Sequence, residues 1–580
     1  MRMNLNRFPS RLRFSLTSLL LVALSIAPSG CFTGQTYEAY YGSIIVPREQ
    51  GFRWIDGTLP QTFDPAFAAA PPDTDLVRAL FEGLTDYDPQ TLAPVPAVAK
   101  HWESANDGRT WTFYLRENAR WSNGDAVVAK DFVDSWRRTM RIGDLAPHTD
   151  LLSNIVGSAA VSVPEVPARN SSSRGTRANS ENPITRADAR FGAEAVDEHV
   201  LRVRLQVPDL NFPALVAHPV FRPIKVAPEN TLKRIDATGL VSNGAFLLTQ
   251  QDKNRVLLQR ADNYWARNEV ALERVEFIGA NNAEAALAAY RAGEVDAVTN
   301  SAFEPLALKL LAPYQDFRRE TYGALTYYSF NVAHEPFDDV RVREALAIAI
   351  DRERLAQDDM GGATEPAKKF LPELKTESAK VVVSKTELLE LDAERARELL
   401  AEAGYPDGRG FPVVRLLINR NEQQRLIANS IAQMWRSILN IEIEISIKGW
   451  DEYEAAISAG EYDVVRRGMV MQTTDELTNI RALFQPESQP VASPANATTA
   501  ASGSSGTARE RLESPKPSPL ESEADALKEL RAIPLYFASS HALVKPYVTG
   551  FDSNLLDAPS LRRVRIETNW TAPKNANSGR

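Results

Sequence analysis

The segment DLVRALFEGLTDYDPQTLAPVPAVAKHWESANDGRTWTFYLRENARWSNGDAVVAKDFVDSWRR, residues 75–138, decides the fold. Its apolar residues first recur at helical spacing, at Leu76 and Leu80. They then alternate with polar residues at Trp111, Phe113 and Leu115, and return to helical spacing at Phe132 and Trp136. This order predicts a helix, a strand and a second helix, which is an α/β arrangement. We expect the aromatic rings to be buried in a core, as large apolar side chains usually are.

Length and charge narrow the possible classes of protein. The chain has 580 residues and a mass of 64.2 kDa. Single cores stop growing at roughly 250–300 residues, so two or three lobes are expected. The formal net charge is −9. A nucleic-acid partner is not expected, because binding phosphates requires a basic face.

The first 31 residues are typical of an export signal. Several arginines precede an apolar run from Leu16 to Ala27, and Cys31 follows Ser29-Gly30. The run is shorter than the roughly 20 residues that span a bilayer. The site resembles a bacterial lipoprotein cleavage site, although Pro28 stands where leucine is usual, so we expect lipidation of Cys31 and a periplasmic or cell-envelope location. A secreted protein with Cys31, the only cysteine, left unpaired is the alternative.

Three further segments have little apolar periodicity. Residues 32–49 are interpreted as a tether. Residues from about 157 to 185 and from about 486 to 521 are rich in Ser, Pro, Ala and Asn. Such stretches bury too little apolar surface to offset the entropy cost of ordering, so both are predicted to be disordered.

The sequence shows no sign of an enzyme. Its six histidines are scattered, without the spacing of a zinc site, and there is no Gly-rich phosphate loop or nucleophile elbow. His218 is expected to be packed or bonded to the backbone rather than to contact a ligand. We therefore predict no catalytic residue, no metal ion and no cofactor.

Several long blocks in a fixed order, including residues 75–138, closely resemble the extracytoplasmic solute-binding proteins of the peptide/nickel class, family 5. The others include 57–67, 241–278, 285–300, 326–355, 391–412 and 524–566. The blocks are most similar to the periplasmic oligopeptide-binding proteins of ABC importers. The resemblance implies a periplasmic-binding-protein-like α/β fold, with two large lobes and a smaller inserted lobe around a ligand cleft.

The resemblance also implies discontinuous lobes. Lobe I is expected to comprise residues 50–81, 195–330 and 531–568, because the closing segment resembles strands that return to the first lobe. Lobe II is expected at 82–194, with the first disordered insertion, and lobe III at 331–530, with the second.

The residues implied to contact a ligand include both matches and departures. Trp450, Arg466 and Gly468 match the pattern, and Asn300 and Tyr328 are carried over with them. Met469 stands where peptide-binding relatives have tryptophan, and Gln424 stands in place of a histidine.

The most consequential departure is Gln472, which replaces the aspartate that holds the peptide's amino terminus in those relatives. Asp475 could substitute only if the loop shifts. A second ligand loop has Ala69 and Pro71, which offer no carboxylate and no N–H donor at Pro71. The site is therefore expected to prefer a neutral or acidic solute to a free-amino-terminus peptide.

The function implied is that of a substrate-binding lipoprotein of an ABC-type importer. Its expected partners are a small solute, with peptide as one candidate, the permease subunits and, through a lipid anchor, the membrane. We expect a monomer. The alternative is an envelope sensor or interaction lipoprotein that keeps the scaffold but has lost peptide capture.

Overall fold

The computed structural model describes residues 39–105, 107–161, 191–225, 232–373, 388–484, 520 and 522–572. The predicted signal peptide and Cys31 lie outside these residues, as does the greater part of each tract predicted to be disordered.

The main sheet has 11 strands in the order β15-β14-β16-β12-β17-β11-β1-β10-β9-β8, with β13 paired to β17. Its strands are β1 (Gly51–Asp56), β8 (Phe246–Gln251), β9 (Arg255–Arg260), β10 (Arg274–Ile278), β11 (Ala297–Thr299), β12 (Phe317–Phe330), β13 (Thr364–Pro366), β14 (Val414–Asn419), β15 (Ile443–Lys448), β16 (Val464–Val470) and β17 (Ala532–Val544). With the helices around it, this sheet confirms the predicted α/β class.

A four-stranded sheet forms the centre of lobe II, in the order β4 (Ala99–Ser104), β5 (Thr110–Leu115), β7 (Val200–Arg204) and β6 (Ala193–Asp197). On β5, Trp111, Phe113 and Leu115 are buried and their neighbours are partly exposed, as the alternation predicted. Because β7 pairs with β5, the chain leaves lobe II after Arg204, later than the boundary expected at residue 195.

Two short sheets complete the strands: β2 (Thr85–Tyr87) with β3 (Pro94–Pro96), and β18 (Val548–Thr549) with β19 (Arg565–Ile566). The α-helices are α2 (Asp73–Leu80), α3 (Ala129–Ile142), α4 (Ser158–Val161), α6 (Phe212–Leu215), α7 (Ala283–Ala292), α8 (Pro305–Leu311), α9 (Val340–Ile348), α10 (Arg352–Arg354), α11 (Ala393–Glu402), α12 (Glu422–Leu439), α13 (Trp450–Ala459), α14 (Glu476–Phe484) and α15 (Glu523–Glu529).

Helix ends follow from local chemistry. Asn421 caps the start of α12 by accepting the backbone N–H of Gln424, and Asn440 ends that helix in the left-handed conformation. Gly293 ends α7 in the same way, at φ +76°.

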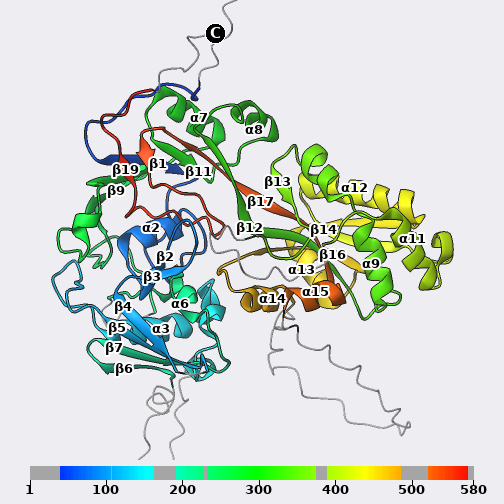
Figure 1. The fold of residues 1–580 in the computed structure, drawn as a ribbon, viewed down its shortest axis with the longest axis horizontal. Coiled ribbons are helices and arrows are strands. Elements are labelled where there is room, and N and C mark those ends of the chain that lie inside the picture. The colour runs from blue at the N-terminus through cyan, green and yellow to red at the C-terminus, as the bar shows by residue number, and fades with distance from the viewer. Residues whose placement is uncertain are drawn as a thin grey trace, which may run out of the picture.

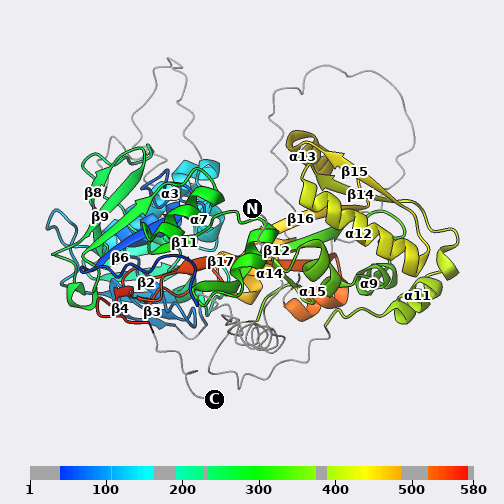
Figure 2. The same ribbon diagram turned by 90° about the horizontal axis from the view of Figure 1, so that it is seen from above.

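The two largest hydrophobic cores among the described residues divide the molecule into halves. One core is continuous through lobes I and II and includes Trp54, Leu80, Phe113 and Trp136, whereas the second belongs to lobe III. Figure 1 shows the halves side by side, connected by the long strands β12 and β17. Figure 2 shows the same connection from above. Each half can therefore keep its own packing if the strands between them flex.

The connection has a break in its ladder. The β12–β17 pairing is regular from Phe317 to Thr321, shifts register before Leu325 and again between Thr326 and Tyr327, and ends at Ser329. Gly323 lies in the break, where its N–H donates to the carbonyl of Leu555 at 2.8 Å and its own carbonyl accepts from Met471 at 2.7 Å. On one side of the break, β11 of lobe I pairs with β17 near Val544. On the other side, β16 of lobe III pairs with β12.

Part of the predicted tether is packed onto lobe I. The N–H of Tyr41 donates to the carboxylate of Asp316 at 2.9 Å, and the N–H of Ser43 donates to the carbonyl of Arg291 at 2.8 Å. Ile44 and Val46 pack against the core of lobes I and II. Ordered chain therefore begins within the segment that the sequence indicated to be a tether.

Candidate functional site

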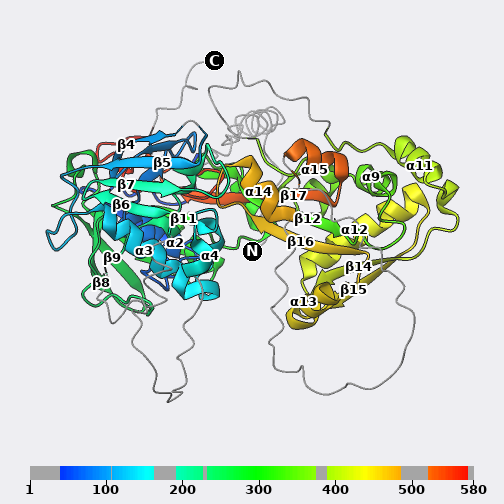
Figure 3. The ribbon, with the colours of Figure 1, turned by 90° about the horizontal axis from the view of Figure 1, so that it is seen from below.

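Most of the expected ligand residues lie on β16, in the loop after it and at the start of α13. The loop leads into α14, which Figure 3 shows on the side of lobe III next to the other half. Two opposite faces of the sheet support this region. Leu416 and Ile418 of β14 pack with residues of α12, whereas Leu417 packs with Tyr453 of α13.

Trp450 is held at the surface. It is the first residue of α13, its side chain is 61 % exposed, and its ring stacks on Tyr453 with centroids 5.6 Å apart. The Tyr453 hydroxyl donates to the carbonyl oxygen of Arg466 on β16. Burial raises the pKa of Tyr453 to about 12, so its hydroxyl keeps the proton that it donates. Trp450 is thus positioned beside the strand that carries Arg466, where its ring is available to a solute.

Arg466 presents a cation without a counterion. No carboxylate lies within 4.0 Å of its guanidinium in the part of the chain that the structure describes. The guanidinium lies over Gly468, where a Cβ would approach its Nη2 to 3.3 Å. A side chain at position 468 would therefore displace Arg466, so the glycine makes room for the charge.

Tyr328 lies opposite Arg466 in the β12–β16 ladder. It is fully buried, and its hydroxyl has no hydrogen-bond partner among the described residues. Burial raises the pKa of Tyr328. In this conformation Tyr328 supports β16 from within the core of lobe III and has no surface open to a solute.

Gln472 contacts the other half of the molecule. Its Oε1 lies 3.0 Å from Nε2 of His218, and its Nε2 donates to the carbonyl oxygen of Val470 at 3.2 Å. His218 precedes a short helical turn, and its Nδ1 accepts the N–H of Val220 at 3.2 Å. Burial, with the charges of His148 and Arg78 nearby, lowers the pKa of His218 well below its ordinary value. His218 is therefore neutral near pH 7.

A second histidine meets the other altered ligand loop. His148 lies with its ring 4.8 Å from that of His218, edge to face. Its Nε2 lies 2.9 Å from the carbonyl oxygen of Ala69. A carbonyl can only accept, so His148 donates this bond. The two histidines thus each contact one of the loops that depart from the peptide-binding pattern.

Asp475 makes a second contact between the halves. It accepts a hydrogen bond from Asn211 Nδ2 at 2.6 Å and caps the start of α14 through the N–H of Thr478. Asp209 lies nearby, and burial together with the charge of Asp475 raises the pKa of Asp209 to about 6. Asp475 is therefore already engaged by the protein in this conformation.

Gln424 and Met469 face the interior of lobe III. Gln424 is buried and donates to the Tyr536 hydroxyl at 2.9 Å, while its own oxygen finds no partner in the part of the chain that the structure describes. Met469 packs against the lobe III core. The structure does not place either side chain in contact with Gln472.

Asn300 belongs to a separate polar group in lobe I. Its backbone is left-handed, at φ 49°, and its Nδ2 donates to Asp56 at 2.6 Å. Burial raises the pKa of Asp56 to about 6, with the neighbouring Asp557 carboxyl adding to the shift. Burial and the nearby Asp56 also raise the pKa of Asp75 well above its ordinary value.

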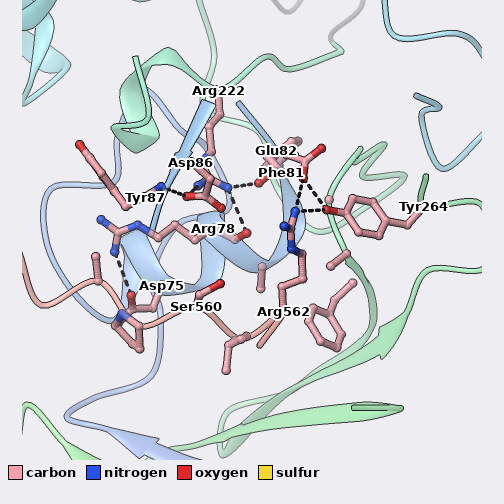
Figure 4. A pocket seen from close by; sticks show the side chains of 17 residues that line it. Asp75, Arg78, Phe81, Glu82, Asp86, Tyr87, Arg222, Tyr264, Ser560 and Arg562 are labelled. Carbon is pink, nitrogen blue, oxygen red and sulfur yellow. Dashed lines mark hydrogen bonds and ion pairs between the residues drawn. The ribbon is translucent and has the colours of Figure 1, made fainter. Parts of the chain in front are cut away.

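Next to this group is the enclosed pocket of Figure 4, below α2. Three arginines in it pair with carboxylates that also line it: Arg78 with Asp75 at 3.1 Å, Arg222 with Asp86 at 3.2 Å, and Arg562 with Glu82 at 3.3 Å. Arg562 also pairs with Glu269, at 3.8 Å. The cavity has a volume of about 30 Å³, enough for about one water molecule. Its charges balance one another, so we assign it a structural role and not solute binding.

Within the described ranges, no three His, Cys, Asp or Glu side chains are grouped so that they could hold a metal ion. Among the same residues, no helix combines the length and apolarity that crossing a bilayer requires.

Comparison with known proteins decides the family. The profile described as bacterial extracellular solute-binding proteins, family 5 Middle, matches residues 93–490. The chain belongs to this family. It is 29 % identical over 534 residues to the periplasmic murein peptide-binding protein MppA of Escherichia coli K12, covering 89 % of this chain and 93 % of that protein. It is also 29 % identical to the periplasmic oligopeptide-binding protein OppA of the same organism, with 86 % and 88 % covered.

A solved structure of the family gives the same architecture. The unliganded open form of the MppA periplasmic murein tripeptide-binding protein superposes with a TM-score of 0.69 at 26 % identity, covering 90 % of this chain and 98 % of that one. The expected solute-binding family and its periplasmic-binding-protein fold are therefore confirmed.

Sequence reasoning missed the histidine contacts of this family member. His218 does bond to the backbone, as expected, but it also contacts Gln472, 254 positions away. His148 was not singled out at all. No spacing in the sequence marks the two residues, because 70 positions separate them and folding alone brings their rings together.

Proposed function

We propose that this chain is the substrate-binding subunit of an ABC-type importer, which binds a small solute between its two halves and presents it to permease subunits. The guanidinium of Arg466, which has no carboxylate within 4.0 Å among the described residues, carries the proposal. A charged donor that the protein itself leaves free can orient a solute that offers it an acceptor. Membership of the solute-binding family supports the same role.

Closure of the two halves would couple binding to transport. A solute that contacts both halves binds the closed form more tightly, so it shifts the population toward that form. The register break at Gly323 gives β12 a place to bend. In this proposal the permease distinguishes the closed form from the open form, and the chain itself performs no catalysis.

The ligand is proposed to be neutral or acidic. Relatives in the family are named for binding oligopeptides or a murein peptide. In this chain Gln472 cannot neutralise a peptide's ammonium, and leaving such a charge unpaired costs several kcal/mol, roughly 3–5 when a buried partner is removed. An anion would instead gain Arg466 as its partner.

The location is proposed to be the periplasm or cell envelope, with a lipid on Cys31 holding the protein at the membrane and the chain acting as a monomer. The motif before Cys31 and the periplasmic names of the relatives support this location.

An envelope sensor or interaction lipoprotein is the second candidate function. The contact of Gln472 with His218 favours it, because a protein that no longer captures peptides can use these side chains to hold its halves together.

Native mass spectrometry of gently purified full-length protein tests the proposal. We expect a co-purified solute, and small-angle scattering should show a smaller radius of gyration when that solute is restored to stripped protein. The matched Arg466→Gln variant should lose most of this response. If no solute co-purifies and no candidate solute changes the radius, the sensor function is the better description.

A further inference from the structure

The hydrogen bonds around His218 fix which of its nitrogens carries the proton. A backbone N–H can only donate, so the bond from Val220 to Nδ1, at 3.2 Å, requires a lone pair on Nδ1. In neutral histidine the hydrogen is then on Nε2. His218 is 3 % exposed and lies beside a second imidazole, so its neutral form is favoured.

The fixed tautomer in turn orients the Gln472 amide. The Nε2–H of His218 donates to Oε1 of Gln472 at 3.0 Å. The amide nitrogen then faces the carbonyl oxygen of Val470 at 3.2 Å, which is an acceptor and suits an N–H. One amide hydrogen remains, for which the described residues supply no acceptor.

The same polarity extends to the loop at Ala69. Its carbonyl oxygen would be a possible acceptor for an ammonium group, but it already accepts from His148. At both loops that depart from the peptide-binding pattern, a histidine N–H therefore already occupies the oxygen that could accept from an ammonium group: Oε1 of Gln472 in one loop and the carbonyl of Ala69 in the other. An ammonium brought to this place would find its acceptors in use, whereas an oxygen would find a free N–H.

We propose that His218 determines the specificity of this subsite, by presenting the Gln472 amide to the ligand as a hydrogen-bond donor. The subsite then takes an oxygen acceptor, either the carbonyl of an acylated amine or a carboxylate, in place of an ammonium group. This inference rests on the proposed function and adds the residue that selects the ligand. It makes acyl-capped compounds and acids the class of solute to be sought.

Calorimetry on the full-length protein with a matched pair of probes tests the proposal. The probes are tri-L-alanine and N-acetyl-tri-L-alanine, which differ at the amino terminus alone. We expect the acetylated probe to bind the wild type about tenfold more tightly, and Gln472→Glu to reverse the preference. That variant keeps the side-chain shape, accepts from His218 and replaces the free N–H by a carboxylate oxygen.

His218→Asn separates the specificity role from a structural one. Asparagine is also able to accept the Val220 N–H, because its side-chain oxygen suits a bond two residues along the chain, but it is too short to reach Gln472. The Gln472 amide can then rotate, so the preference for the acetylated probe should fall to about twofold or less. A purely structural role of His218 would weaken both probes equally and leave their ratio unchanged.

Each outcome has a defined meaning. Equal or tighter binding of tri-L-alanine by the wild type overturns the proposal, as does a preference that survives His218→Asn in full. Failure of both probes to bind the wild type at 1 mM also overturns it. The proposed transport function survives that failure if a different solute co-purifies with the protein, and falls with it if none does.

Discussion

The contact between His218 and Gln472 predicts how easily the two halves separate. Both side chains are neutral, and a typical neutral hydrogen bond contributes about 0.5–1.5 kcal/mol. His218→Asn removes the bond and leaves the half-buried Gln472 amide, which water can reach. The equilibrium constant for separating the halves should therefore rise about 2- to 13-fold.

Gln472→Ala should have a larger effect than His218→Asn. It leaves the Nε2–H of His218 without an acceptor at a site that is 3 % exposed, and an unsatisfied buried donor costs about 1–3 kcal/mol. Separation of the halves lets water reach this N–H, so the cost falls on the contacting state alone. The equilibrium constant should rise about 5- to 150-fold. Because the two changes remove one bond, the double variant should show less than the sum of their effects.

Single-molecule fluorescence energy transfer measures these populations. With Cys31, the only cysteine, replaced by serine, dyes can be placed at Lys253→Cys and Glu394→Cys. Both positions are exposed, one between β8 and β9 of lobe I and the other on α11 of lobe III. If Gln472→Ala leaves the populations within twofold of those of the starting protein, or if the two substitutions are fully additive, the contact does not link the halves.

Two other predictions concern the same region. Gly323→Ala should lower the free energy of unfolding by about 1 kcal/mol in urea titrations, because the new Cβ would lie 3.1 Å from a backbone oxygen. The control is Gly51→Ala, at a strand glycine with looser surroundings, which should change the free energy of unfolding little. Equal losses in the two variants would contradict this prediction. Asp209 should titrate near pH 6 by NMR, and Asp475→Asn should lower its pKa in part, because burial, the larger cause of the shift, remains. The raised pKa means that the ionised form of Asp209 is disfavoured in the contacting state, so the free-energy cost of ionising it there is present above about pH 6 and fades as the pH falls. Acidification from pH 7 to pH 5 should therefore strengthen the contact between the halves. A pKa of Asp209 that Asp475→Asn leaves unchanged would contradict this prediction.

Local patterns predicted local structure well. The alternation at Trp111 and Phe113 gave β5, and the spacing of Phe132 and Trp136 gave α3, with all four side chains buried. These elements depend on which face of a helix or strand is apolar, a property that adjacent residues determine. The end of α7 at Gly293 is local in the same sense, because a left-handed residue at a helix end favours glycine or asparagine.

Boundaries depended on contacts that no local pattern contains. The residues of β7 were assigned to lobe I because a recognisable block began near residue 195. Their lobe is decided by pairing with β5, about ninety positions earlier. The packing of Ile44 against lobe I is a second case, because a short segment with few apolar residues can still be held by backbone bonds to distant partners.

The chemistry of the site shows where sequence reasoning stops. The replacement of aspartate by Gln472 is visible in the sequence and predicts the loss of a charge. It does not predict what is gained, because an amide can offer either its oxygen or its nitrogen to a ligand. That choice depends on the tautomer of His218, and the tautomer depends on the N–H of Val220. The polarity of the subsite therefore depends on a chain of three residues, Val220, His218 and Gln472. The first two lie more than 250 positions from the third, so only the structure shows that they act together.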